Sequence, residues 1–197
     1  MKLPESAHMD QPWRIHQIAP GFDVEDVWRV PGRSTPAGFH AFVGGFGERR
    51  SSPLPVRVLF SVRRQLGRLF GWDGEESGLG SRTASLRERL PSDLRETAPS
   101  LEFEGTQFDP LYLTGDEFAA EIANATMHGV LHFGLTDDGT VQMAVLVKPN
   151  GLGGRLYMAA IKPFRLFLVY PALLRELGRQ LARANEATEA NELTDAA

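Results

Sequence analysis

The spacing of apolar residues in the first half of the chain predicts mainly helices. Apolar positions recur at helical intervals over 55–70, and 86–94 indicates a short helical piece interrupted by proline. Asp23 fits the N-cap of a short helix over 24–30. The exception is 13–19, where polar and apolar residues alternate and predict a first strand.

The second half of the chain has the pattern of consecutive strands followed by a helix. Strands are predicted over 111–113, 118–123, 126–135 and 140–148. The Asp138-Gly139 pair between the last two is a strong signal for a hairpin turn. Residues 118–123 could instead form a helical turn, because alanine and glutamate favour helix. Over 154–183 the period is helical, with two prolines expected to break or kink the run.

This order of elements predicts an α+β fold. A long amphipathic C-terminal helix must bury its apolar side, and the face of an antiparallel sheet is the large apolar surface available to it. We therefore expect a sheet curved around the C-terminal helix (a helix-grip arrangement), with helical insertions in the first half and an apolar cavity between helix and sheet. Residues 1–184 are expected to form this single domain, and the acidic residues 185–197 a disordered tail.

Composition narrows the functional classes. A length of 197 residues with 42% hydrophobic and 23% charged residues is typical of one globular domain. Zero cysteines exclude disulfides, zinc–thiolate sites and thiol catalysis, and the formal charge of −4 gives no general attraction to nucleic acid or to anionic membranes. The apolar stretch 152–181 is interrupted by charged residues, so it predicts a buried helix and no membrane span. No signal-peptide pattern is present, and the cytoplasm is the expected compartment.

Three stretches of the sequence are distinctive. They are LRERLP at 86–91, PLYLTGDEFAAEIAN at 110–124 running into TMHGVLHFG at 126–134, and QMAVLVKPNGLGGRLY at 142–157 with KPFRLFLVYP at 162–171. Together they resemble a bacterial family catalogued as domain of unknown function 2867, which is similar to START-like helix-grip domains such as polyketide cyclases and lipid carriers. The resemblance implies a START-like domain with a ligand cavity, but it supplies no catalytic residues.

His128 and His132 have the spacing of the His-x-x-x-His pair of zinc enzymes. That pair needs a helix and a glutamate directly after the first histidine, whereas this segment is a predicted strand with Gly129 in that place. On a strand the two imidazoles share a face about 13 Å apart, too far for one metal ion. We therefore expect no metal site, and interpret both histidines either as polar groups of a pocket or as side chains at a rim or in solvent.

Three further patterns have both a structural and a functional interpretation. The glycine-rich turn 150–155 lacks the dinucleotide-binding spacing and predicts a helix cap, with anion binding at the helix N-terminus left open. Glu117 and Glu121 share a face and could do acid–base work, although solvated carboxylates are the expected interpretation. Four arginines make the helix over 55–70 basic, which usually means a solvated face and alternatively a phosphate or partner surface.

These patterns favour a domain that binds an apolar small molecule in the cavity between the sheet and the C-terminal helix. Candidates for the apolar wall are Met143, Val145, Phe167, Tyr170 and Leu174, and candidates for the polar groups are Tyr112, Glu121, His128, Lys148 and Tyr157. Which face of 126–135 lines the cavity is left open, and no cofactor is expected. The alternatives are a cyclase- or dehydratase-like acid–base enzyme with a histidine or glutamate as proton carrier, and a protein interaction module that uses the basic helix 56–70.

Overall fold

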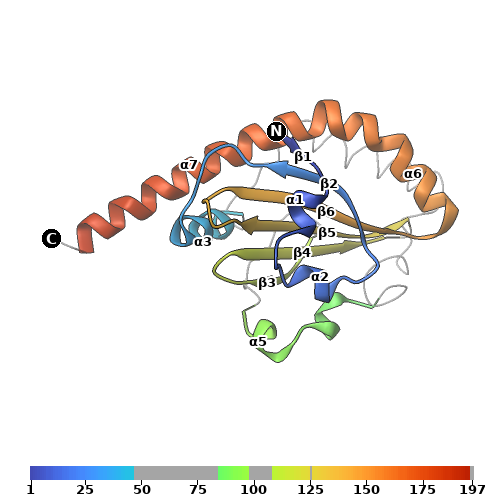
Figure 1. The fold of residues 1–197 in the computed structure, drawn as a ribbon, viewed down its shortest axis with the longest axis horizontal. Coiled ribbons are helices and arrows are strands. Elements are labelled where there is room, and N and C mark those ends of the chain that lie inside the picture. The colour runs from blue at the N-terminus through green and yellow to red at the C-terminus, as the bar shows by residue number, and fades with distance from the viewer. Residues whose placement is uncertain (47–83, 98–107, 125, 196–197) are drawn as a thin grey trace.

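The computed structural model describes residues 1–46, 84–97, 108–124 and 126–195, and every structural statement below concerns these residues (Figure 1). Six strands in this part of the chain form one antiparallel sheet in the order β1-β2-β6-β5-β4-β3. The strands are β1 (Lys2–Leu3), β2 (Asp23–Arg29), β3 (Asp109–Leu113), β4 (Glu117–Ala123), β5 (Met127–Leu135) and β6 (Val141–Pro149). The helical elements are α1 (Ser6–Met9), α2 (Ile15–Ile18), α3 (Pro36–Gly44), η1 (Leu86–Arg89), α5 (Ser92–Arg95), α6 (Gly151–Phe164), the π-helical η2 (Arg165–Val169) and α7 (Tyr170–Asp195). The predicted α+β class, a sheet with a long C-terminal helix, is confirmed.

The β5–β6 hairpin forms where the Asp138-Gly139 pair predicts it. Gly139 has a φ of +77°, a left-handed conformation that favours glycine, and the Thr136 N–H donates to the Thr140 carbonyl at 2.9 Å. Hydrogen bonds from Thr136 and Thr140 lower the pKa of the exposed Asp138 carboxyl to about 2. Residues 118–123 are part of strand β4 and form no helical turn, since β4 pairs with both β3 and β5.

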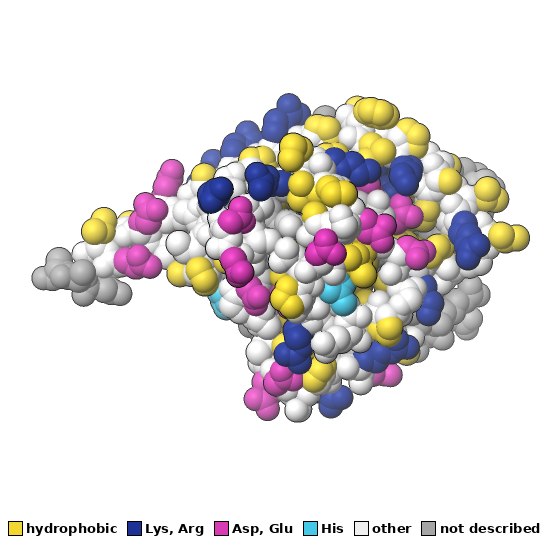
Figure 2. Space-filling view, viewed as in Figure 1, with side chains coloured by type: hydrophobic (Ala, Val, Ile, Leu, Met, Phe, Trp, Pro, Cys, Tyr) yellow, Lys and Arg dark blue, Asp and Glu magenta, His cyan; other side chains and the backbone are white. Residues whose placement is uncertain are grey.

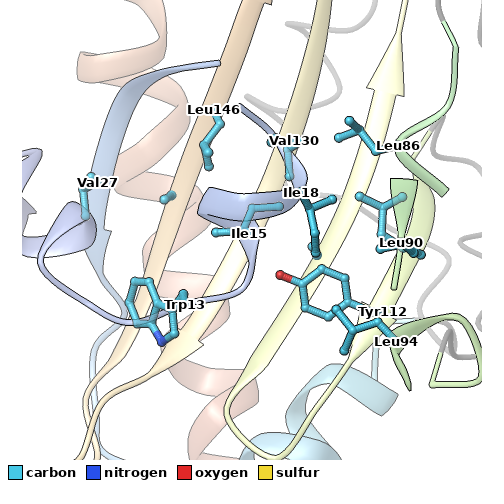
Figure 3. Close-up of a cluster of buried hydrophobic side chains, with 14 residues drawn as sticks. Trp13, Ile15, Ile18, Val27, Leu86, Leu90, Leu94, Tyr112, Val130 and Leu146 are labelled. Carbon is cyan, nitrogen blue, oxygen red and sulfur yellow. The ribbon is translucent and has the colours of Figure 1, made fainter. Parts of the chain in front are cut away.

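Side chains of the sheet alternate between two faces, which we call face A and face B. Face A carries Ala119 and Ala144, and face B carries Phe118 and Phe133. The N-terminal α2, with η1 and α5, packs on face A in one cluster of buried apolar side chains (Figure 3). Helices α3 and α7 pack on face B in a second cluster. The sheet therefore lies between the early segments and the C-terminal helix.

A glycine in β5 allows the N-terminal segment to lie close to face A. The indole of Trp13 occupies the space where a Cβ on Gly134 would stand. Trp13 is 3% exposed, and its ring centroid lies 5.0 Å from that of His132 on the same strand. The seat of Trp13 on the sheet therefore depends on the absence of a side chain at this one position.

The C-terminal helix runs without a loop through α6, η2 and α7 (Figure 1). Pro163 has no backbone N–H to donate within α6, and the π-helical turn begins two residues later at Arg165. The helix thus passes Pro163 beside a π-helical turn. Further along, α7 packs so closely on α3 that a Cβ on Gly38 would overlap the side chain of Asn185.

Two predictions for the first half are wrong. Residues 15–18 form the helical turn α2, where the alternation over 13–19 predicts a strand, because a carboxylate of the sheet binds the first N–H groups of that turn. Residues 23–29 form strand β2 and no helix, so Asp23 begins a strand and caps nothing. A bulge between Val24 and Asp26 shifts the strand's alternation, and the apolar residues then fall at a spacing that resembles a helix.

The end of the chain also differs from its prediction. Residues 185–195, expected to belong to a disordered tail, are the last part of α7. The Asn185 side chain donates to the Arg33 carbonyl and accepts from the Ser34 hydroxyl, both at 2.7 Å. These contacts join the start of this part to the body of the domain. The predicted helix over 55–70 lies outside the described residues.

Candidate functional site

Two histidine–glutamate pairs lie buried on face A. The register of β4 and β5 places His128 and His132 on the same face as Glu117 and Glu121. His132 Nε2 is 3.2 Å from Glu117 Oε2, and His128 Nε2 is 2.8 Å from Glu121 Oε2. All four residues are at most 3% exposed. The interpretations of the carboxylates as solvated and of the histidines as rim or solvent side chains are therefore wrong.

The Glu117 carboxylate holds α2 against the sheet. It accepts hydrogen bonds from the N–H groups of Arg14 at 2.8 Å and Ile15 at 3.4 Å, and from the Tyr112 hydroxyl at 2.9 Å. Burial alone would raise the pKa of Glu117, but the hydrogen bond and charge of His132, with the other donors, hold that pKa below its ordinary value. Burial, reinforced by the carboxylate, raises the pKa of Tyr112 well above its ordinary value.

Glu121 holds η1 in the same way. Its carboxylate accepts from the Ser85 hydroxyl and, at 3.1 Å, from the Leu86 N–H at the start of η1. Burial alone would raise the pKa of Glu121, and the hydrogen bonds from His128, Ser85 and Leu86 more than offset this. Each carboxylate of the sheet therefore fastens one covering segment to face A.

A third histidine extends the Glu117–His132 pair. His8 in α1 lies with its Nε2 3.0 Å from His132 Nδ1, and its ring centroid is 4.9 Å from that of His16. Burial, and then the charges of His132 and His16, lower the pKa of His8 to about 2. Burial also lowers the pKa of His132. Both imidazoles are therefore neutral at pH 7, so one ring nitrogen can donate and the other accept.

This network on face A joins segments of the protein to one another. Its carboxylates are occupied by donors from the protein itself and are buried, whereas an acid–base catalyst must reach its substrate. The described residues also contain no group of three or more His, Cys, Asp or Glu side chains placed to hold a metal ion. The acid–base alternative therefore gains no support from these residues.

Face B carries a different polar cluster, where β2 meets η2 and α7. The Tyr170 hydroxyl donates to Asp26 Oδ2 at 2.9 Å, and Arg165 Nη2 lies 3.3 Å from the same oxygen. Asp26 is 1% exposed, and Lys2 Nζ is 3.2 Å from its other oxygen. Arg165 also pairs with Glu25 at 3.3 Å. Burial is the main cause that raises the pKa of Tyr170.

Two N–H donors of this cluster, Arg165 Nε and Trp28 Nε1, are buried and have no hydrogen-bond partner in the described part of the chain. The ring centroid of Trp28 lies 5.0 Å from that of Tyr170, and the Arg165 side chain is 7% exposed. Most buried N–H groups in proteins are hydrogen-bonded. This corner of face B therefore favours a hydrogen-bond acceptor.

The apolar side chains of face B are fully buried in one part and partly exposed in another. In the part under α3 and α7, Phe133 is 1% and Met143 0% exposed. Toward α6 and η2, apolar side chains of both the sheet and the helix are only partly buried. This half-buried set consists of Met127, Leu131, Val145, Ile161 and Leu166. The covering of face B by the long helix is thus incomplete at its α6 end.

The predicted site residues divide between the two faces of the sheet. Tyr112, Glu121 and His128 are buried on face A, and Lys148, which pairs with His128, is exposed. Met143, Val145, Tyr170 and Leu174 belong to the cluster on face B. Phe167 in η2 is 79% exposed, and Tyr157 lies in α6. The polar candidates, Tyr170 apart, and the apolar candidates therefore do not line one shared cavity.

Sequence reasoning missed Asp26, Arg165 and Trp28. Asp26 lies in a segment that the sequence assigns to a helix, where an acidic residue indicates a solvated side. Assigning this segment to a bulged strand would have placed Asp26 on a face with Trp28. Arg165 interrupts an apolar stretch and resembles a solvated residue, and its partner Asp26 is 139 positions away, which no local pattern records.

Comparison with known proteins identifies a family and no close relative. The model of a family described as "Protein of unknown function (DUF2867)" matches residues 18–172. This match confirms the resemblance to that family, and it includes Asp26, Arg165 and Tyr170. No curated protein and no solved structure matches the chain.

Proposed function

This chain belongs to the DUF2867 family, and from its own geometry we propose that it binds an apolar small molecule that carries a hydrogen-bond acceptor. The apolar part lies against the half-buried set, between face B and the helix α6–η2. The acceptor lies at Arg165 Nε and Trp28 Nε1. The observation that carries the proposal is the contrast along face B, which is fully buried beneath α7 and only partly buried beside two unpaired donors.

The energetics of burial favour such a ligand. Each 100 Å² of apolar surface removed from water contributes about 2.5 kcal/mol, and the half-buried set offers apolar surface on both sheet and helix. An acceptor on the ligand adds hydrogen bonds to donors that are otherwise unpaired, and such bonds give a small-molecule site its orientation. An apolar molecule with a carboxylate or ketone fits both requirements.

The proposal keeps the START-like interpretation, in which a ligand lies between a sheet and its long C-terminal helix, and it keeps the cytoplasm as the compartment. Val145 and Tyr170 retain the role predicted from sequence. The polar contacts move from Glu121 and His128 to Arg165 and Trp28 on the opposite face. The alternative of an interaction module depends on 56–70, outside the described residues.

A thermal-shift assay of the full chain with oleic acid tests this proposal. A ligand that binds only the folded state stabilises it by about 2.7 kcal/mol at a hundredfold excess over its Kd, which raises Tm by roughly 5–10 °C for a domain of this size. Oleylamine has the same chain but a cationic donor at its head. It should give a smaller shift, because Arg165 Nε and Trp28 Nε1 require an acceptor.

Matched variants locate the site. Leu131→Trp fills the space beside the half-buried set and should abolish the shift from oleic acid. Leu156→Trp places the same side chain on an exposed position of α6, where Leu156 is 72% exposed, and should leave the shift unchanged. Trp28→Phe removes one donor and should reduce it. The proposal fails if oleic acid leaves Tm unchanged, or if Leu131→Trp and Leu156→Trp respond alike.

A further inference from the structure

The outer side of α6 and η2 carries large apolar side chains in contact with solvent. Leu152 is 77%, Leu156 72%, Phe167 79% and Leu168 53% exposed. Leu152 and Leu156 are four residues apart and Phe167 follows eleven residues later, about one and three helical turns, so these three lie along one line of the helix. Met158, 5% exposed, packs on Val147 of the sheet instead. We call the four exposed residues the outer apolar line; Figure 2 shows apolar and basic side chains together along this helix.

The charge around the outer apolar line is of one sign. Residues 151–175 contain Arg155, Lys162, Arg165 and Arg175 and no aspartate or glutamate, although the whole chain has a formal charge of −4. Arg155 and Arg175 are exposed, and Lys162 lies 3.8 Å from Glu25 with its side chain 48% exposed. A local excess of cations beside exposed apolar residues complements a surface that is anionic outside and apolar beneath.

We propose that α6 and η2 lie in the interface of an anionic phospholipid bilayer. The outer apolar line enters the boundary between head groups and acyl chains, and the basic side chains extend to the lipid phosphates. The side of the helix that carries Met158 and Arg165 stays on the sheet. The formal charge of the whole chain does not oppose this, because charge beyond about 8–10 Å is screened at physiological salt.

Two other occupants fit the outer apolar line less well. The helix Gly151–Thr194 is long and apolar enough to cross a membrane by length and composition, but in a span the Arg165–Asp26 and Tyr170–Asp26 contacts would have to break. A second copy in a two-fold dimer would place identical surfaces against each other. Arg155 and Lys162 of one copy would then approach those of the other, at a like-charge cost.

Vesicle co-sedimentation of the full chain tests the proposal. We expect binding to vesicles of phosphatidylcholine and phosphatidylglycerol (7:3) at least tenfold tighter than to phosphatidylcholine alone, weakened by salt and reversed by alkaline carbonate. Leu156→Glu and Phe167→Glu should each reduce binding at least tenfold. Leu193→Glu is the matched control, because Leu193 is 75% exposed but lies near the end of α7. Since all three positions are exposed, Tm should stay within a few degrees of the wild type.

Each other result counts against the interface. No preference for anionic vesicles, or an equal loss in Leu193→Glu, overturns the proposal. Resistance to alkaline carbonate indicates a span. A dimer in sedimentation velocity that Leu156→Glu dissociates, without vesicle binding by the wild type, indicates a second copy as the occupant.

Discussion

The hydroxyl of Tyr170 donates a hydrogen bond to Asp26 across 144 positions of the chain, at 2.9 Å. This contact fixes the long helix to β2 at the point where the π-helical turn ends and α7 begins. On one side of the contact α7 packs tightly on α3 and the sheet, and on the other side α6 leaves the half-buried set partly exposed. The proposed ligand site follows from this change in packing at Tyr170.

Removing the Tyr170 hydroxyl should destabilise the fold moderately. In Tyr170→Phe the buried Asp26 carboxylate keeps Arg165 and Lys2 but loses its hydroxyl donor, and hydrogen bonds to charged groups contribute about 1.5–3 kcal/mol. Urea denaturation measures the loss. In a double-mutant cycle with Asp26→Asn, the two changes should be non-additive, and full additivity would show that the hydrogen bond contributes nothing.

Gly134→Ala should destabilise the protein, because the new methyl group overlaps the indole of Trp13. Overpacking of a core costs about 1–3 kcal/mol. Gly153→Ala is the control: nothing lies within 4 Å of its Cβ position, and in a helix alanine is favoured over glycine by about 0.5–1 kcal/mol. Thermal melts of the two variants should therefore move in opposite directions, and a neutral Gly134→Ala would mean that Trp13 does not sit on β5.

Cutting the Glu121 contact should free η1 locally. Glu121→Ala removes the acceptor for Ser85 and Leu86 and leaves His128 without its carboxylate, and the loss of one partner from a buried pair costs about 3–5 kcal/mol. Hydrogen exchange should accelerate at the amide of Leu86 before it does in β5 and β6. Glu88→Ala, an exposed change in the same helical turn, should leave that exchange rate as in the wild type.

The histidine network should make the fold sensitive to acid. His8 has a pKa of about 2 in the fold and about 6.5 when unfolded, so below pH 6.5 the unfolded state binds more protons and the free energy of unfolding falls. One such group contributes up to about 1.4 kcal/mol per pH unit. The lowered pKa of His132 acts in the same direction. The lowered pKa of Glu117 adds a loss of stability as pH falls through and below about 4.5.

His8→Gln tests the main part of this dependence. Glutamine can still hydrogen-bond to His132 but does not titrate, so the free energy of unfolding should change less between pH 6.5 and 5 than in the wild type. His40→Gln, at an exposed position of α3, should keep the wild-type slope. Equal slopes in all three proteins would show that His8 is protonated in the fold.

The sequence predicts the second half of the fold well and the first half poorly. The Asp138-Gly139 turn and the alternation in β5 and β6 are local signals, and the structure confirms them. In the first half, the bulge at Asp26 replaces the period of a strand with one that resembles a helix. The helical turn α2 depends on Glu117, more than 100 residues away, whose effect no window of sequence contains.

The same distinction applies to the candidate sites. The sequence places His128 and Glu121 correctly on one face of the sheet, but it does not show that both are buried and paired, because the segments that cover them are distant in sequence. Val145 and Tyr170 follow from the apolar pattern of a strand and a helix. Arg165 does not, since a charged residue in an apolar helix has the same local pattern whether it is solvated or paired with a buried Asp26.

Methyl NMR of the chain labelled with ¹³C at its methionine methyl groups tests the central claim most directly. Of the five methionines, Met127 and Met158 lie on face B toward α6, whereas Met9 is 49% exposed at the end of α1. Titration with oleic acid should shift the Met127 and Met158 signals and leave the Met9 signal in place. Unchanged Met127 and Met158 signals at an oleic acid concentration that raises Tm, or shifts confined to Met9, would contradict a ligand site between face B and α6.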